Sequence, residues 1–306
     1  MSAAYTLLAI ALSGTTVLAQ KPSPSPKPFP ASTRAAIEDA LGRKGAPFPG
    51  GVLKFGFPRG DLHVVANGVT LRPAFALGSW VAFQRVKDHA MVMGDLVLVE
   101  GEVESVMASL QQNGVEQTAL HNHLLGESPR VMYMHIHAIG NPTRIARAIR
   151  TALEFTGTPL AAPAPIPTTP VAPIAPLDLD TAAIAAALGA HGNVNGGVYQ
   201  VSIPRREKIK EEKHEIPPSM GISTAINFQS TGAGKAAITG DFVLLGREVN
   251  PVLWAMAEGG IQVTAIHSHM LFEEPRLFFM HFWANDDAIK LARGLRAALA
   301  RTGSKP

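Results

Sequence analysis

Residues 116–138 read EQTALHNHLLGESPRVMYMHIHA, and residues 262–284 read QVTAIHSHMLFEEPRLFFMHFWA. The two stretches are identical at 11 of 23 positions, with one constant offset of 146 residues. The pair Gly94-Asp95 returns as Gly240-Asp241 at the same offset. Agreement at a fixed register over such a length indicates that one domain has been duplicated in tandem.

The quoted stretches have the pattern of a β-hairpin, with two alternating segments around a short Gly/Pro turn. Helical spacing of apolar residues before and after it predicts flanking helices, with Ser32 and Asp180 as N-caps of the helix that opens each copy. We therefore expect an α+β fold, each copy an antiparallel sheet with helices on one side, which leaves the other face free for chemistry. The expected helices are 32–41, 102–112, 141–155 and 180–188, and the expected strands are 52–57, 62–65, 80–84, 95–99, 115–124 and 130–138.

The remaining segments predict the domain boundaries. Residues 1–19 resemble a signal peptide, although no Lys or Arg precedes their apolar run. Two Pro-rich segments, 20–31 and 158–176, are expected to be a tether and a linker. The two repeat domains then span 32–157 and 177–304, and we expect an exported protein, periplasmic or extracellular, without a transmembrane segment.

Composition excludes several classes of protein. The net charge is +3, from 27 basic and 24 acidic residues spread along the 306 residues, which gives no basic surface for nucleic acid. Cysteine is absent, so disulfides, thiolate metal sites and a cysteine nucleophile are excluded. Hydrophobic residues make up 46% and charged residues 17%, the balance of a packed globular chain.

Seven of the 11 histidines lie in the two hairpins. Residues two apart on a strand point to the same face, so four imidazoles of the first hairpin can converge on one patch. Imidazole and carboxylate ligands without thiolate suit zinc first, with Mn, Fe, Ni or Cu as alternatives. The alternative without a metal is that the histidines hydrogen-bond one another or the backbone. The predicted metal ligands are His121, His123, His135, His137, His267, His269, His281 and Glu273.

Trp283 replaces His137 in the second copy, so the first copy is the better candidate for a working site. Glu127, in the hairpin loop, is the candidate ligand or general base, and Arg130 the candidate anion-binding residue. An ion pair with the hairpin glutamate is the alternative for Arg130 and for Arg276, its counterpart in the second copy.

Other residues carry weaker signals. Arg59 and Arg205 are further anion-binding candidates. Asp95 and Asp241 follow glycines, and capping of a turn is the favoured interpretation over a catalytic role. Met134 and Met280 alternate with the histidines and should therefore pack in the core rather than bind copper.

MGDLVL at 93–98 and TALHNHLLGESPRVMYMHIH at 118–137 resemble the LppY/LpqO family of exported bacterial proteins. The resemblance covers nearly the whole chain after residue 19, in two copies. It implies an exported protein with a domain of unknown function, but named members are lipoproteins and this chain lacks the lipobox cysteine.

Three hypotheses about function remain open from the sequence. The first is a divalent-metal-binding protein, with metal-dependent hydrolysis of a small molecule as its candidate reaction. The second is a non-catalytic module that binds a metal or a cell-envelope component. The third is a structural pair of domains whose histidines have no chemical role.

Overall fold

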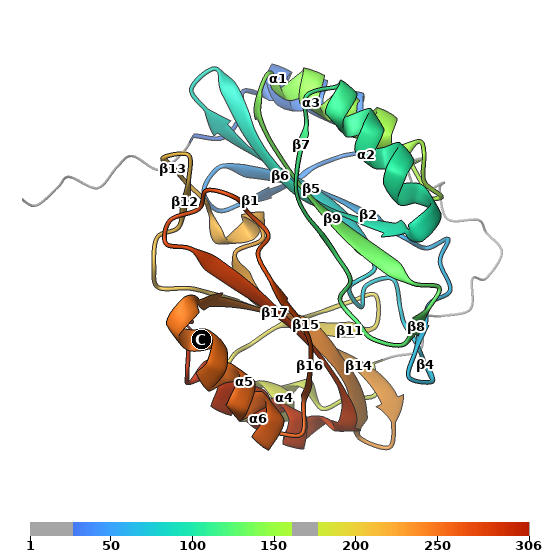
Figure 1. The fold of residues 1–306 in the computed structure, drawn as a ribbon, viewed down its shortest axis with the longest axis vertical. Coiled ribbons are helices and arrows are strands. Elements are labelled where there is room, and N and C mark those ends of the chain that lie inside the picture. The colour runs from blue at the N-terminus through green and yellow to red at the C-terminus, as the bar shows by residue number, and fades with distance from the viewer. Residues whose placement is uncertain (1–26, 161–176, 306) are drawn as a thin grey trace, which may run out of the picture.

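The computed structural model describes residues 27–160 and 177–305 and contains nearly the same order of elements twice, the first repeat having one additional short strand and the second one additional 3-10 helix. Each repeat forms an antiparallel sheet of six strands with helices packed on one face (Figure 1). The uncovered faces of the two sheets lie against each other, so helices form the outer layers and sheets the inner layers. The predicted duplication and α+β class are confirmed. The predicted signal peptide, and most of the predicted tether and linker, lie outside the described residues.

The sheet of the first repeat has the order β1-β2-β5-β6-β9-β7, so the hairpin strand β7 lies at the edge. A separate small sheet, β4-β3-β8, lies beside it. The elements are α1 (Ala31–Leu41), β1 (Ala46–Phe48), β2 (Val52–Pro58), β3 (Val65–Ala66), β4 (Val69–Thr70), β5 (Gly78–Val86), β6 (His89–Val99), η1 (Glu100–Glu102), α2 (Val103–Gln112), β7 (Glu116–His121), β8 (Glu127–Ser128), β9 (Val131–Gly140) and α3 (Pro142–Leu153).

The second repeat has the equivalent order β10-β11-β14-β15-β17-β16. Its short strands β12 and β13 pair with each other. The elements are α4 (Thr181–Leu188), β10 (Asn193–Asn195), β11 (Val198–Pro204), β12 (Lys210–Glu211), β13 (His214–Glu215), η2 (Pro218–Met220), β14 (Ser223–Gly232), β15 (Lys235–Leu245), η3 (Gly246–Glu248), α5 (Val249–Glu258), β16 (Gln262–His267), β17 (Leu277–Asp287) and α6 (Ala288–Leu299).

Local chemistry explains where the helices begin. Asp180 caps α4, as predicted, because its Oδ1 accepts a hydrogen bond from Ala183 N. The prediction of a Ser32 cap was wrong: α1 begins one residue earlier, after Pro30, with no side-chain cap. The predicted strand 62–65 was also wrong, since only Val65–Ala66 pairs, and it pairs in the small sheet.

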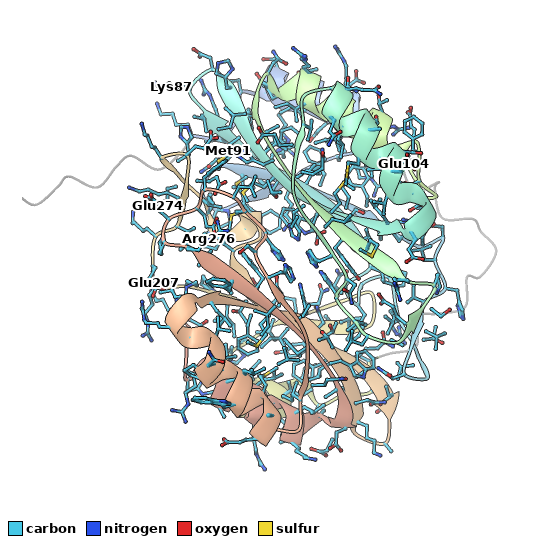
Figure 2. All side chains as sticks on the ribbon, in the orientation of Figure 1. Lys87, Met91, Glu104, Glu207, Glu274 and Arg276 are labelled. Atoms are coloured by element: carbon cyan, nitrogen blue, oxygen red, sulfur yellow. The ribbon has the colours of Figure 1, made fainter. Side chains whose placement is uncertain are left out.

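Each sheet packs an apolar face against its own helices. Met134 of the first repeat and Met280 of the second are fully buried in these outer cores, as the sequence predicted. Further apolar residues lie between the two sheets, among them Met93, Met270 and Phe279. Side chains of both repeats project into the space between the sheets (Figure 2). The two repeats therefore share a packed interface.

Two buried arginines fasten a loop to the sheet at matching places. Arg59 donates to the carbonyl of Val97 and forms ion pairs with Glu102 and Asp61, both at 2.8 Å. Arg205 makes the same contacts in the second repeat, to Val243, Glu248 and Glu207. Both guanidinium groups therefore form ion pairs within their own repeats. The repeated Pro-Arg motif has a structural role, and neither arginine needs an anionic ligand to explain it.

The repeated Gly-Asp pair lies in the middle of a central strand. A Cβ on Gly240 would lie 2.0 Å from the carbonyl oxygen of Ala225 on the neighbouring strand, and one on Gly94 would lie 2.8 Å from that of Trp80. Only glycine fits where the backbones approach so closely.

We expect Gly240→Ala to destabilise the protein by roughly 1–3 kcal/mol or more, because an added methyl group overpacks the sheet. Gly56→Ala is the matched control, since a Cβ there has nothing within 4 Å. Urea unfolding of both variants measures the difference. Equal stability of the two would contradict the steric account.

Candidate metal centre

The histidine hairpins occupy equivalent places in the two repeats. In the first, the register pairs His121 on β7 with Tyr133 on β9. β7 ends at His121, so His123 lies in the following loop rather than in the strand predicted to reach Leu124. The side chain of Asn122 donates to the carbonyl of Leu124, a local bond that competes with strand pairing.

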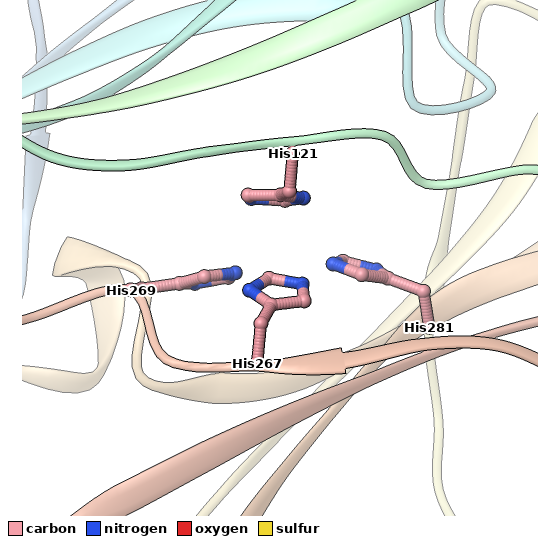
Figure 3. A group of neighbouring side chains, drawn as sticks. All are labelled: His121, His267, His269 and His281. Atoms are coloured by element: carbon pink, nitrogen blue, oxygen red, sulfur yellow. The ribbon is translucent and has the colours of Figure 1, made fainter.

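The two hairpins meet where the sheets face each other. Four histidines, one from the first repeat and three from the second, place one ring nitrogen each within 4.8 Å of all the others (Figure 3). His121 points down from its strand toward the other three rings. We call these four residues the histidine cluster: His121, His267, His269 and His281.

Two more histidines stack on the cluster from the first repeat. The ring centroid of His123 lies 3.9 Å from that of His281, and that of His135 lies 3.6 Å from that of His269. The residue offset of 146 relates these two pairs to each other. The centre is therefore approximately two-fold symmetric. His121 and His267 face each other across the axis, with their ring centroids 3.7 Å apart.

Backbone carbonyls orient three rings of the cluster. Nδ1 of His121 lies 3.3 Å from the carbonyl of Asn122, and Nδ1 of His267 lies 3.4 Å from that of Ser268. Nδ1 of His281 lies 3.1 Å from the carbonyl of Gly240. Because a carbonyl accepts only, Nδ1 carries the proton in each ring and Nε2 keeps its lone pair. This is the arrangement found in metal-ligating histidines.

The Nε2 atoms of the cluster are buried and have no hydrogen-bond partner, and the same holds for His123, His135 and His137. Burial, together with the field of His267, lowers the pKa of His121 to about 3. Burial, with the other imidazoles, also lowers the pKa of His281 well below its ordinary value. The cluster is therefore neutral at neutral pH, which is the ligating state of imidazole.

Some predicted ligands lie apart from the cluster. His137 is buried, but its recorded polar neighbour is Glu116, at 3.6 Å from Nδ1. Its counterpart Trp283 packs edge-on against Phe75. Glu273 accepts hydrogen bonds from Leu277 N and from Arg276, within its own hairpin.

The hairpin loop of the first repeat holds the predicted catalytic pair. Glu127 accepts a hydrogen bond from Val131 N, and burial raises its pKa to about 7. Arg130 is exposed and pairs with Glu100 at 3.3 Å, whereas Arg276 pairs with Glu273 as the alternative interpretation expected. Neither Glu127 nor Arg130 lines the cavity described below.

Asp95 and Asp241 were underestimated from the sequence. Both lie inside central strands rather than at turns, because the strands run on through the glycine. Asp95 is paired in register with His135, and Asp241 with His281. Burial raises the pKa of Asp95 to about 7 and that of Asp241 well above its ordinary value, the field of Asp95 adding to the latter. The repeated Gly-Asp pair within apolar residues was the available signal.

A cavity of about 650 Å³ opens beside the cluster. Residues of both repeats line it, and His269 and His281 are among them. Asp95 and Asp241 also line it, with His123 and His135. The cavity therefore brings two histidines of the cluster and two largely buried carboxyl groups to a space that a small molecule can enter.

A family model described as "Domain of Unknown Function (DUF1259)" matches residues 35–155 and 182–301, which is more than half of the chain. The chain belongs to this family. Its two matched segments are the two repeats, so the duplication is a duplication of this domain. No curated protein matches the chain in sequence.

Among solved structures, the chain is similar to a trimeric bacterial microcompartment shell protein, PduB. The identity is 10%, the TM-score is 0.21, and the match covers 82% of this chain and 86% of that one. EtuB from Clostridium kluyveri is similar at 10% identity and a TM-score of 0.23, with coverage of 84% and 90%. Within residues 27–160 and 177–305, no helix is both long and apolar enough to span a membrane.

In the DUF1259 repeats of this chain, burial predicts how stability depends on pH without metal. Below the ordinary histidine pKa of 6.5, the unfolded chain takes up protons that the folded chain cannot. Six central histidines act in this direction and four acidic groups with raised pKa oppose them, so the net slope is positive once the unfolded histidines are almost fully protonated, below about pH 5.5. The histidines are His121, His123, His135, His267, His269 and His281, and the acids are Asp95, Glu127, Glu211 and Asp241.

We expect the metal-free protein to lose at least about 1.4 kcal/mol of unfolding free energy per pH unit as the pH falls from about 5.5 toward about 4. Urea unfolding in the presence of a chelator, repeated across that range, measures the slope. A flat profile, or one that rises toward acid, would mean that the histidines are not buried as neutral groups.

Proposed function

We propose that this protein binds one divalent transition metal ion, zinc in the first place, through the histidine cluster, and catalyses a hydrolytic reaction in the adjoining cavity. Mn, Fe, Ni and Cu are the alternative ions, because imidazole suits all of them. The proposal replaces two independent hairpin sites with one site to which both repeats contribute.

The observation that carries the proposal is the set of buried, unpartnered Nε2 atoms in the cluster. A buried polar atom without a partner is costly, and seven such atoms in two hairpins form an unusual concentration. A bound cation would remove this cost for the four atoms of the cluster by accepting their lone pairs. The alternative without a metal expected the histidines to hydrogen-bond one another or the backbone. These Nε2 atoms have no such partner, so that alternative does not account for them.

A bound zinc ion would supply a water of lowered pKa and polarise a substrate oxygen. The residues of the chain would supply the rest. Asp95 lines the cavity and has a pKa of about 7, so it is the group suited to accept or return a proton there. The pKa of Asp241, which faces the same cavity, is raised well above its ordinary value by burial, and this favours the protonated form, which can donate a hydrogen bond.

One observation favours a second candidate, a non-catalytic metal-binding module. Four imidazoles complete the tetrahedral set of zinc, and complete sets are typical of structural or carrier sites, whereas catalytic sites keep one position open. Against this, His269 and His281 line the cavity, which favours catalysis because a substrate could reach a metal ion held there.

Substitution of Asp95 separates the two candidates. In zinc-loaded protein, we expect hydrolysis of p-nitrophenyl acetate or bis(p-nitrophenyl) phosphate, and a fall of roughly 10²–10⁴-fold in Asp95→Asn with the zinc retained. The cobalt(II) form should change its visible spectrum on addition of azide. A cobalt spectrum that azide leaves unchanged, together with no hydrolysis, would favour the non-catalytic module.

Export remains part of the proposal, with a leader at residues 1–19, repeat domains at 32–157 and 177–304, and a small molecule or cell-envelope component as ligand. The resemblance to the LppY/LpqO family supports this location. The N-terminal sequence of protein recovered from the producing cells tests it: cleavage near Ala19 is expected, and an intact N-terminus would contradict it.

A further inference from the structure

The cavity beside the histidine cluster has two unlike walls. In each repeat, residues paired in register form a row across the sheet, Trp80–Asp95–His135 in the first. The second repeat has Asp241 and His281 in the same positions, but Ala225 in place of Trp80. The aspartate and the histidine of the row are thus the same in both repeats, and the residue on the next strand differs.

The second difference lies on the neighbouring strand. Lys54 on β2 lines the cavity, and the offset of 146 places Gln200 on β11 at the equivalent position, also in the wall. Gln200 is engaged, because its Nε2 donates to the carbonyl of Ala74 at 2.8 Å. One wall therefore carries a cation and the other a neutral amide.

The ammonium group of Lys54 has no full charge partner of its own. Its Nζ donates to the carbonyl of Ser219 at 3.0 Å and lies 4.0 Å from the ring centroid of Trp80. These contacts fix the position of the group without neutralising it, and they leave donor capacity on an ammonium that has three protons. Burial lowers the pKa of Lys54 to about 8, against the field of Asp95, so the group is still charged at neutral pH.

Trp80 is held in place from the other side. A Cβ on Gly221, in the loop of the second repeat, would lie 2.8 Å from the indole ring, so that loop contacts the ring directly. Lys54, Trp80 and this loop form a fixed corner of the cavity. A partly buried cation in a fixed corner is an arrangement that can bind an anionic group of a ligand.

We propose that the cavity binds a small organic molecule with an anionic oxygen-acid group, carboxylate or phosphate, on Lys54, and directs the rest of the molecule toward His269 and His281. The inference deepens the proposed function by naming the substrate class of the same site. It requires the cavity and Lys54, whereas the proposed function requires the cluster and a metal.

Calorimetric titration with three matched probes tests the inference: benzoate, phenyl phosphate and the neutral benzamide. Each is titrated into zinc-loaded and zinc-free wild type, Lys54→Gln and Lys208→Gln. Lys54→Gln installs the residue that the second repeat carries at this position. Lys208 is an exposed lysine paired with Glu215, so Lys208→Gln is a control for the loss of one positive charge.

We expect at least one of the two anions to bind the wild type and Lys208→Gln alike, and to bind Lys54→Gln about tenfold more weakly or worse. Benzamide should be weak and insensitive to the substitution. Zinc content, measured in every sample, should be unchanged by Lys54→Gln. Which anion is preferred distinguishes carboxylate from phosphate substrates.

Two outcomes separate this inference from the proposed function. Anion binding that depends on Lys54 in a protein that retains no zinc would support the substrate class and overturn the metal. A zinc-loaded protein in which neither anion binds, or in which Lys54→Gln binds them as well as the wild type, would overturn the substrate class and leave the metal centre standing.

Discussion

Replacement of either His121 or His267 by alanine is expected to lower the affinity of the protein for zinc by more than about a hundredfold, since loss of an outer-shell partner alone costs up to that much. The two residues come from different repeats, and their ring centroids lie 3.7 Å apart. Because the proposed metal site takes ligands from both hairpins, a substitution in either repeat should remove it. Competition with a chromophoric chelator measures both affinities.

His137→Ala is the matched control for these variants. His137 is a buried histidine of the same hairpin, but its polar neighbour is Glu116 rather than the histidine cluster. We expect its zinc affinity to remain within a few-fold of the wild type. If His137→Ala loses zinc while His267→Ala keeps it, the first hairpin alone holds the metal, and the shared site is wrong.

Arg205→Met is expected to cost about 3–5 kcal/mol of unfolding free energy. The arginine side chain is 1% exposed, and its removal leaves the largely buried carboxylate of Glu248 without its charge partner. The pKa of Glu248 is lowered in part by hydrogen bonds from Arg205, against the effect of burial, which indicates that the carboxylate is ionised in the fold. Urea unfolding at neutral pH measures the cost.

Two further variants isolate the buried pair in this prediction. Arg247→Met removes an exposed arginine beside Glu207 and should cost at most about 1 kcal/mol, as surface pairs do. Arg205→Met/Glu248→Gln removes the unpaired charge as well and should recover part of the loss. A double variant as unstable as Arg205→Met would show that packing of the arginine stem, rather than charge, is responsible.

The sequence determined much of the fold, because its signals are local. The helical spacing at 141–155 and the Asp180 cap predicted real helices, and alternation around Leu125–Pro129 predicted the hairpin. Strand ends were less certain, as at His123, where a side-chain hydrogen bond from Asn122 replaces strand pairing. Such competition between local bonds and the sheet cannot be read from periodicity.

The histidines of the site were predicted, but their arrangement was not. The pattern placed four imidazoles on one hairpin, whereas the cluster takes one from the first repeat and three from the second. Which surfaces pack together depends on the shape of two whole sheets, and no short motif encodes it. Asp95 was missed for a related reason, since Gly-Asp is typical of turns unless the close approach of Trp80 on the neighbouring strand is known.

The number of metal ions per chain tests the central claim most directly. Elemental analysis of purified protein, saturated with zinc and then dialysed without chelator, gives this number. One shared site predicts a single tightly held ion per chain, which His121→Ala and His267→Ala each remove. Two ions per chain, each removed by substitutions in one hairpin only, would show that the repeats bind metal independently, and no retained ion would contradict the metal centre altogether.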